Sequence, residues 1–247
     1  MSGDQRTSQA ARSGVTRALV EGELEVLGAL PGSSNAALLV RCHAGDDTCI
    51  AVYKPMRGEA PLWDFPDGTL HRREVAAFEL ARALGWPRIP PTVLREGPYG
   101  PGSVQAFIEF DPQHHFFTME IERADTFRRV ALFDIAANNA DRKGGHCLLD
   151  DAGDVWMIDH GVCFAVEPKL RTVIWTFIDE PIPADAAADL TRVRDDLAAG
   201  GSLATTLAAL LDPEEVAAVR SRIERLLGAG RFPEPEPGVR PYPWPPI

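Results

Sequence analysis

Two short apolar segments separated by a turn most constrain how this chain folds. The segments are Cys147–Leu149 and Val155–Ile158, and apolar runs split by a Gly- and Asp-rich turn are typical of a β-hairpin. Because a hairpin brings its two ends together, Asp159 should return to the neighbourhood of Asp141 and His146. Two carboxylates and an imidazole at one place destabilise a fold unless a cation or a substrate uses them. We therefore expect a metal–nucleotide complex to bind here.

The composition is that of a globular protein, since 45% of the 247 residues are hydrophobic and 25% are charged. The formal net charge of -11 argues against a nucleic-acid-binding protein, which would carry a basic surface. No apolar run approaches the roughly 20 residues that cross a bilayer, so we expect no integral membrane segment. The first residues lack the apolar core of a signal peptide, and we expect a cytoplasmic protein. The four cysteines show no metal-ligand spacing, which favours reduced thiols packed as small hydrophobic side chains.

The first part of the chain predicts an antiparallel sheet. Residues 1–14 are polar, small and aperiodic, and we expect them to be disordered. Three short strands at 23–27, 36–42 and 49–54, joined by tight turns, predict a meander. The loop from Gly28 to Asn35 has two interpretations. It is either an ordinary turn or a phosphate cover, in which small residues let backbone N–H groups approach an anion.

A lysine and a glutamate near the end of this sheet form a second candidate feature. Lys54 closes the third strand, and a helix with Thr69 as its N-cap is predicted to run to Leu84. Glu74 lies beside the apolar stripe of that helix, where a carboxylate needs a cation. Lys54 is the nearest cation in the sequence, and the pair would position the lysine against phosphate oxygens. The alternative is that the two are unrelated surface charges.

The pattern then changes from strands to helices. Residues 93–94 and 103–108 predict another hairpin, which completes an N-terminal lobe over residues 15–108. A mainly helical lobe follows over residues 109–230, with helices predicted at 125–138, 185–199, 203–211 and 213–227. Residues 231–247 contain seven prolines and should be extended, with Tyr242 and Trp244 lying across the helices. The fold class is therefore α+β.

This order of features resembles the two-lobed protein-kinase-like superfamily. Asp141-Arg142 through His146 is similar to the Asp-Arg-His-x-x-Asn catalytic loop of the phosphatidylinositol 3-/4-kinase-related branch, and Ile158-Asp-His-Gly161 to its Ile-Asp-Phe-Gly metal motif. The segment Arg73–Gly85, followed by Pro90–Thr92, resembles the corresponding helix and exit in HipA-like kinases. As a whole the chain resembles an actinobacterial group within that set. The resemblance covers about residues 20–185.

The resemblance implies a role for each matching position. Lys54, oriented by Glu74, would contact the phosphates of ATP, and Asp141 would position the attacking hydroxyl or accept its proton. Asp159, with His146, would hold Mg²⁺ or Mn²⁺. The remaining implied contacts are a phosphate cover that includes Ser33, Ser34 and Asn35, and adenine-binding backbone groups at Phe107, Ile108 and Glu109. Phosphoryl transfer needs charge neutralisation and in-line positioning more than covalent chemistry, so we expect the Lys54 amine to point into the pocket that Asp141 and Asp159 face.

The sequence departs from the family pattern at three positions. His146 stands where the family has Asn as second metal ligand, and magnesium prefers oxygen ligands. Either the second metal is weak or absent, or Mn²⁺ is used, or Asn138 or Asn139 supplies an amide. Lys143 stands where lipid kinases place His, and His160 replaces the Phe that packs beneath the metal motif.

These departures leave three functions open. The leading hypothesis is an ATP-dependent phosphotransferase whose hydroxyl acceptor is a protein, a small molecule or an inositol headgroup. Lys169 and Arg171, in the loop after the metal motif, are candidates to meet an anionic acceptor. The second hypothesis is a nucleotide-binding pseudokinase with a regulatory role. The third, ranked lower, is a metal-dependent hydrolase that adds His114 and His115 as ligands.

Overall fold

The computed structural model describes residues 14–30, 35–238 and 240–247. The chain divides into two compact units: unit 1 comprises residues up to Val75 and Pro90–Phe107, and unit 2 comprises Ala76–Ile89 and Ile108–Ile247. The predicted disorder of residues 1–13 falls outside the described residues, whereas residues 14–21 are helical. The domain boundaries that we drew from the sequence pattern stay predictions.

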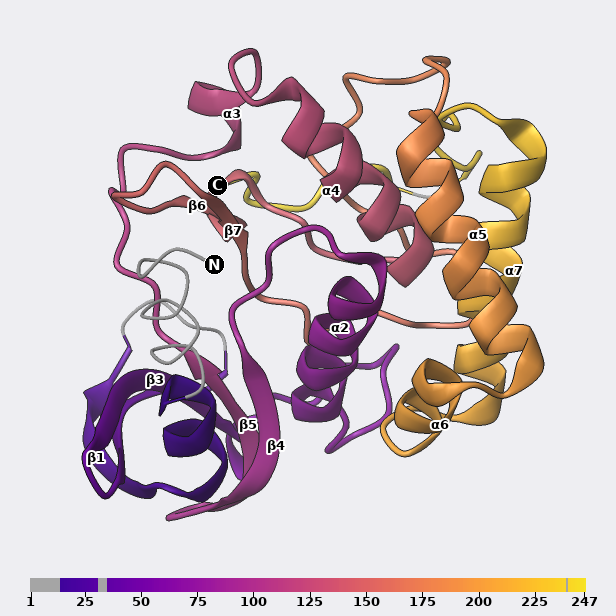
Figure 1. Ribbon diagram of the computed structural model, residues 1–247. Coiled ribbons are helices and arrows are strands. Elements are labelled where there is room, and N and C mark those ends of the chain that lie inside the picture. The colour runs from indigo at the N-terminus through magenta and orange to yellow at the C-terminus, as the bar shows by residue number, and fades with distance from the viewer. Residues whose placement is uncertain (1–13, 31–34, 239) are drawn as a thin grey trace, which may run out of the picture. The chain divides into compact units, whose positions relative to one another are not determined.

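Unit 1 contains a five-stranded antiparallel sheet with the order β1-β2-β3-β5-β4 (Figure 1). The strands are β1 (Glu23–Ala29), β2 (Leu38–Ala44), β3 (Asp47–Pro55), β4 (Thr92–Gly97) and β5 (Gly100–Ala106). The predicted meander and the predicted second hairpin are thus both confirmed. A small core forms on one face of the sheet, where the side chains of Leu19, Val40, Tyr53 and Val104 are fully buried.

Glycines in β4 and β5 make room for a buried tyrosine at the centre of this sheet. A Cβ at Gly97 would lie 2.6 Å from the ring of Tyr53, and a Cβ at Gly102 would lie 2.6 Å from the same ring and 2.5 Å from the Lys54 carbonyl oxygen. Contacts this short are not tolerated, so only glycine fits at either position. The close packing fixes the end of β3, which carries Lys54.

The helix α2 (Leu70–Leu84) begins as the sequence predicts but is capped differently. The carbonyl of Thr69 accepts the first helical hydrogen bonds, whereas the carboxylate of Glu59 accepts from the amides of Leu70 and His71 at 3.1 and 2.8 Å. A carboxylate at a helix N-terminus satisfies unpaired N–H groups and complements the helix dipole. The contact also ties the loop after β3, including the 3₁₀ turn η1 (Met56–Gly58), to α2.

Unit 2 is mainly helical, with one short hairpin (Figure 1). Its elements are α3 (Phe116–Met119), α4 (Ala124–Ala137), the 3₁₀ turn η2 (Gly144–His146), β6 (Cys147–Leu149), β7 (Val155–Met157), α5 (Ala184–Ala199), α6 (Ser202–Ala208) and α7 (Pro213–Ala229). The hairpin that we predicted from the two apolar segments is confirmed by the antiparallel pairing of β6 with β7. The helix α7 packs against α4 and α5 around a large apolar core.

Local signals account for the ends of α7. Asp212 and Glu215 form a reciprocal capping box around Pro213, and Gly230 ends the helix with φ 64°, as helix start and stop residues commonly do. The helix α6 ends at Ala208, three residues before the predicted end at 211. Within the described residues no helix has the length and the apolar character needed to cross a bilayer.

The proline-rich tail packs differently from the prediction. The side chains of Tyr242 and Trp244 are exposed (51% and 75%) rather than laid across helices. Instead, backbone carbonyls anchor the tail: the Pro241 oxygen accepts from the amide of Thr172 and the indole of Trp175, and the Pro246 oxygen accepts from Gly144 N at 2.8 Å. Because proline has no N–H, a proline-rich segment can only accept backbone bonds at those positions.

Candidate active site

Lys54 and Glu74 form an ion pair inside unit 1. Lys54 lies near the end of β3, opposite Ser103 of β5, and Glu74 lies on the buried side of α2. The side chains are 21% and 4% exposed. An ion pair with so little solvent contact is screened far less than a surface pair, so these are not the unrelated surface charges of the alternative interpretation.

The predicted phosphate cover is described only in part. Ser33 and Ser34 lie outside the described residues. The side chain of Asn35 accepts a hydrogen bond from the amide of Ala60 at 2.8 Å, and Ala36 N donates to the Gly58 carbonyl at 3.0 Å. These bonds fix the end of the cover against the loop after β3. The contact of these residues with nucleotide phosphates stays a prediction.

The three positions expected to bind adenine lie where unit 1 ends and unit 2 begins. Phe107 is the last residue of unit 1, and Ile108 and Glu109 follow in unit 2. The Phe107 amide donates to the carbonyl of Ile50 at 3.0 Å, which continues the pairing of β5 with β3. This amide is therefore already used by the sheet, and adenine binding by Ile108 and Glu109 stays a prediction.

Two asparagines at the end of α4 shape the loop that carries Asp141. Asn138 adopts the left-handed conformation, with φ 50°, and its amide donates to the carbonyls of Ala165 and Glu167 at 2.8 and 2.7 Å. The side chain of Asn139 donates to Asp134 at 2.9 Å and accepts from the amide of Asp141 at 3.0 Å. Both side-chain amides thus hold backbone in place, which argues against the suggestion that one of them ligates a metal.

A buried ion pair between Arg142 and Asp134 holds this loop against α4. Arg142 donates to Asp134 through Nε and Nη2 at 3.0 Å each, and both side chains are completely buried. The same guanidinium donates to the Ile158 carbonyl and contacts the ring of His160 at 2.7 Å. The imidazole of His160 packs edge-on against Phe133. The histidine therefore occupies the place of the family phenylalanine as a packed ring, and it also contacts Arg142.

The carboxylate of Asp141 lies beside charges of both signs. Burial raises the pKa of the Asp141 carboxyl, Lys143 and Arg171 lower it, and the charge of Asp159 raises it; the net direction is upward. The Lys143 amine lies 3.3 Å from the Asp141 carboxylate, whose side chain is 34% exposed. A partly exposed carboxyl with a raised pKa is suited to take up a proton.

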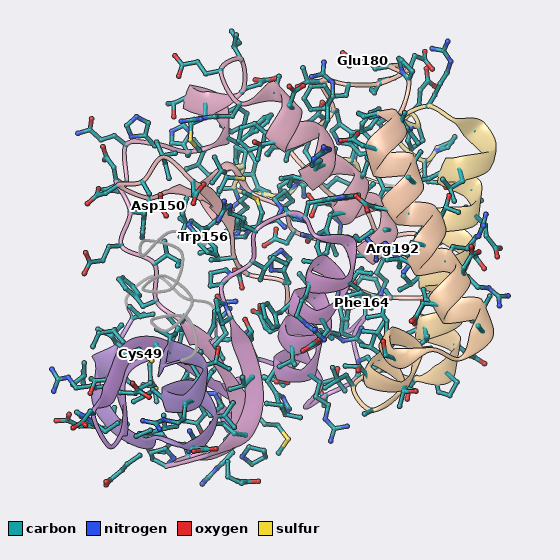
Figure 2. All side chains as sticks on the ribbon, viewed as in Figure 1. Cys49, Asp150, Trp156, Phe164, Glu180 and Arg192 are labelled. Atoms are coloured by element: carbon teal, nitrogen blue, oxygen red, sulfur yellow. The ribbon has the colours of Figure 1, made fainter. Side chains whose placement is uncertain are left out.

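The hairpin returns Asp159 to His146, as predicted from the sequence. Asp159 Oδ2 lies 3.3 Å from His146 Nε2, and Asp159 has φ 63°. The hairpin turn is closed by Asp150, which accepts from the indole of Trp156 at 2.8 Å (Figure 2). His146 Nδ1 accepts from the amide of Lys143 at 3.3 Å. A neutral imidazole that accepts at Nδ1 carries its proton on Nε2, which is the nitrogen that faces Asp159.

The donor set fits one hard cation bound mainly by Asp159. Magnesium is commonly held by one or two carboxylates together with water and phosphate oxygens. The Asp159 side chain is 50% exposed, whereas a neutral His146 that accepts at Nδ1 has a proton, and not a lone pair, on the nitrogen that faces Asp159. In the part of the chain that the structure describes, no group of three or more His, Cys, Asp or Glu side chains could hold a metal by itself. His114 instead pairs with Asp111 at 3.0 Å.

The structure thus collects the expected residues into two sets. Lys54 and Glu74 contact each other in unit 1, and Asp159 in unit 2 contacts His146 and influences the pKa of Asp141. The expectation that Lys54 points into the same pocket as the two aspartates stays a prediction. Asp134 was not among the residues predicted from the sequence, although a signal existed: it lies four residues after Val130 on the apolar side of a predicted helix, where a carboxylate needs a partner.

Comparison with solved structures defines the fold class of the protein. The structure is similar to the Helicobacter pylori proinflammatory kinase CtkA, with a TM-score of 0.52 over 86% of this chain and 94% of that chain, at 10% sequence identity. The protein therefore has a protein-kinase-like fold, as predicted. No protein-family model matches the sequence, and the resemblance to the phosphatidylinositol 3-/4-kinase-related or HipA-like branch stays a prediction.

Comparison with curated sequences gives the family. The chain is 38% identical over 262 residues to Protein Rv2133c of Mycobacterium tuberculosis, an alignment that covers 92% of this chain and 93% of that protein. The chain belongs to the same family as Protein Rv2133c.

Proposed function

We propose that this protein is an ATP-dependent phosphotransferase that moves the γ-phosphate of ATP to a hydroxyl acceptor with the help of Mg²⁺ or Mn²⁺. The observation that carries the proposal is the arrangement around the β6–β7 hairpin. It keeps an exposed carboxylate, Asp159, close to Asp141, whose pKa is raised. The kinase-like fold and the buried Lys54–Glu74 pair support the same function.

Each residue has a defined part in the proposed reaction. Asp159 would hold the metal, which when bound neutralises charge on the phosphate oxygens. The acceptor hydroxyl attacks the γ-phosphorus, the bond from that phosphorus to the oxygen of the ADP leaving group breaks, and Asp141 accepts the hydroxyl proton. Lys54, held by Glu74, contacts the phosphates. In this scheme His146 orients Asp159 by donating a hydrogen bond, instead of serving as the second metal ligand that the family resemblance implied.

The acceptor is proposed only as a class. A protein, a small molecule or an inositol headgroup each offers a hydroxyl group, and Arg171 lies close enough to Asp141 to lower its pKa. A cation beside the proposed base suits an anionic acceptor. A lipid substrate would normally come with a basic surface that faces the membrane, and the net charge of -11 does not favour it.

A thermal-shift experiment with ATP and divalent cations tests the proposal. ATP with Mg²⁺ or Mn²⁺ should raise the melting temperature of the wild type, and the D159N variant should lose this response while keeping its fold. The matched control is D151N, because Asp151 is an exposed carboxylate in the turn of the same hairpin. An equal ATP response in D159N and D151N would show that Asp159 does not bind the metal.

One observation favours a nucleotide-binding pseudokinase as the second candidate. His146 replaces the family asparagine and lies 3.3 Å from Asp159, at a place where an imidazole is a poor ligand for magnesium. The two candidates differ in turnover. A phosphotransferase consumes ATP when the correct acceptor is present and loses this activity in D141N, whereas a pseudokinase binds ATP without releasing ADP under any acceptor.

A further inference from the structure

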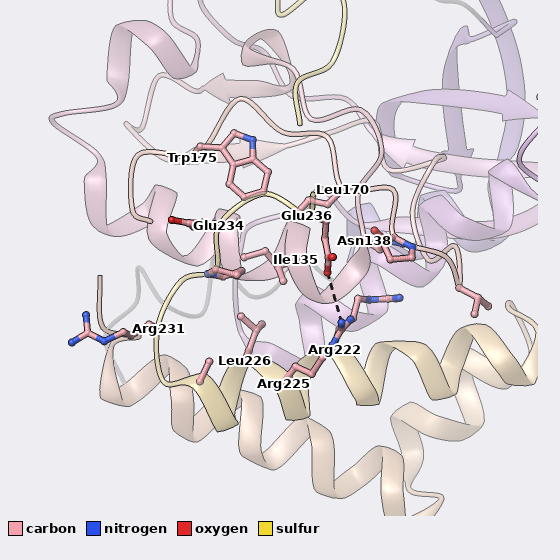
Figure 3. A pocket seen from close by; sticks show the side chains of 14 residues that line it. Ile135, Asn138, Leu170, Trp175, Arg222, Arg225, Leu226, Arg231, Glu234 and Glu236 are labelled. Atoms are coloured by element: carbon pink, nitrogen blue, oxygen red, sulfur yellow. Dashed lines mark ion pairs between the residues drawn. The ribbon is translucent and has the colours of Figure 1, made fainter. Parts of the chain in front are cut away.

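Unit 2 contains a cavity lined in part by Asn138, which shapes the loop that carries Asp141, but by none of the residues to which we assign a direct part in phosphoryl transfer (Figure 3). Its volume is about 260 Å³, and its walls come from the end of α4, the loop after the β6–β7 hairpin, the last turns of α7 and the start of the tail. The apolar part of the wall includes Ile135, Leu170, Trp175 and Leu226. A cavity of this size, lined by apolar groups and a few convergent polar ones, suits a small molecule.

The cavity contains a buried arginine whose hydrogen bonds are incomplete. Arg222 is 7% exposed; Nε donates to the Ala136 carbonyl at 2.8 Å and Nη1 to the Ala165 carbonyl at 3.1 Å. Its Nη2 atom is buried and has no hydrogen-bond partner among the described residues. Burial, with Arg225 nearby, lowers the pKa of Arg222 to about 10, which still leaves it charged at neutral pH. A buried guanidinium with an unused donor is costly unless an acceptor completes it.

The charges around the cavity indicate how much negative charge it would accept. Arg222, Arg225 and Arg231 line it together with Glu234 and Glu236, which leaves one excess positive charge. Arg225 and Glu236 face each other at 3.8 Å and are 66% and 52% exposed (Figure 3), so they partly neutralise each other at the mouth. The carboxylate of Glu215, which is buried outside the lining, also acts on Arg222. The cavity therefore has room for at most one negative charge on a ligand.

We propose that this cavity binds a small organic carboxylate, with the carboxylate against Arg222 and the apolar body against Trp175 and Leu226. Guanidinium and carboxylate groups are geometrically matched, and a phosphate dianion would exceed the charge available. The site does not depend on the proposed phosphotransfer. It does lie close to the loop that carries Asp141, since the Ala165 carbonyl accepts hydrogen bonds from both Arg222 and Asn138.

Titration calorimetry with benzoate, hexanoate and indole-3-carboxylate tests the site on the full chain. We expect saturable binding in the millimolar range or tighter for at least one of them. Benzyl alcohol, which has the shape of benzoate without its charge, should not bind. Phenyl phosphate should bind more weakly than benzoate.

Two alanines of α7 supply the matched variants. Ala229 lines the cavity and is exposed on the helix, so A229F should fill the cavity and abolish carboxylate binding; A217F places the same side chain on an exposed position of α7 outside the cavity and should bind like the wild type. R222M should also abolish binding. Because it removes two hydrogen bonds to the backbone, it could also destabilise the fold, and A229F is therefore the decisive variant. The proposal is wrong if none of the carboxylates binds, or if A229F binds them as tightly as the wild type. It is also wrong if benzyl alcohol binds as tightly as benzoate, or if phenyl phosphate binds more tightly than benzoate.

Discussion

Replacing Asp134 by Asn should destabilise this protein severely, although the two side chains have nearly the same shape. Asp134 is completely buried and accepts from Arg142, which is completely buried as well. The substitution leaves the guanidinium in place and removes the charge that compensates it. The new amide also directs N–H groups at a side chain that only donates, so at least one of the present hydrogen bonds is lost.

The size of the effect follows from the burial of the pair. Removing one partner of a buried ion pair costs roughly 3–5 kcal/mol, because an uncompensated charge is left behind. The whole free energy of unfolding of a domain is about 5–15 kcal/mol, so D134N should lose a large share of it. Arg142 also donates to the Ile158 carbonyl, and the loss should therefore loosen the backbone next to Asp159.

Urea unfolding followed by circular dichroism measures the effect. The series consists of the wild type, D134N, R142M and the double variant, in which neither charge remains; the double variant should lose less than the two single losses added together. D125N is the control on the same helix, because the Asp125 side chain is 99% exposed and its ion pair with Arg128 lies at the surface; it should lose at most about 1 kcal/mol. A loss for D134N within about 0.5 kcal/mol, as for ordinary surface substitutions, would show that Asp134 does not compensate the buried charge of Arg142.

Three further predictions follow from the same unit. The folded-state pKa of Asp141 is raised above its ordinary value of 3.8. The contribution of the protonated carboxyl to the free energy of unfolding is therefore present at low pH and is lost as the pH rises through the folded-state pKa. D141N should therefore be more stable than the wild type at pH 7, and unfolding curves taken at decreasing pH should converge; a constant difference would contradict this. H160F keeps the ring against Phe133 but loses the contact with Arg142, and should cost about 1–2 kcal/mol in urea unfolding; a gain in stability would argue that the contact is repulsive. Deleting residues 241–247 removes three hydrogen bonds to Gly144, Thr172 and Trp175 and should lower stability by about 1.5–4.5 kcal/mol, unless the tail does not dock in solution, in which case the melting temperature is unchanged.

The elements that depend on local signals could be predicted from the sequence. The β6–β7 hairpin follows from two short apolar runs split by a turn, and the ends of α7 follow from a capping box and a C-terminal glycine. Each of these signals lies within a few residues of the element that it determines. For the same reason the contact of Asp159 with His146 could be expected, because a hairpin fixes the distance between its own ends.

Features that depend on contacts across the chain could not be predicted. The pairing of Asp134 with Arg142 requires the loop to fold back under α4, and the docking of the tail requires carbonyls of Pro241 and Pro246 to meet amides far away in the sequence. The hydrogen-bonding role of His146 could not be predicted either, because it depends on which ring nitrogen accepts the hydrogen bond from the Lys143 amide. Residue types alone indicated a metal ligand there.

Titration calorimetry of ATP into the protein, with and without Mg²⁺, measures whether Asp159 holds a metal ion and whether Lys54 contacts the phosphates. We expect Mg²⁺-dependent binding to the wild type, a loss of the Mg²⁺ dependence in D159N, and weaker binding in both K54A and E74K, since Lys54 and Glu74 form one ion pair. If ATP does not bind with either Mg²⁺ or Mn²⁺, or binds equally well to all four proteins, the assignment of this chain as a nucleotide-dependent phosphotransferase is wrong.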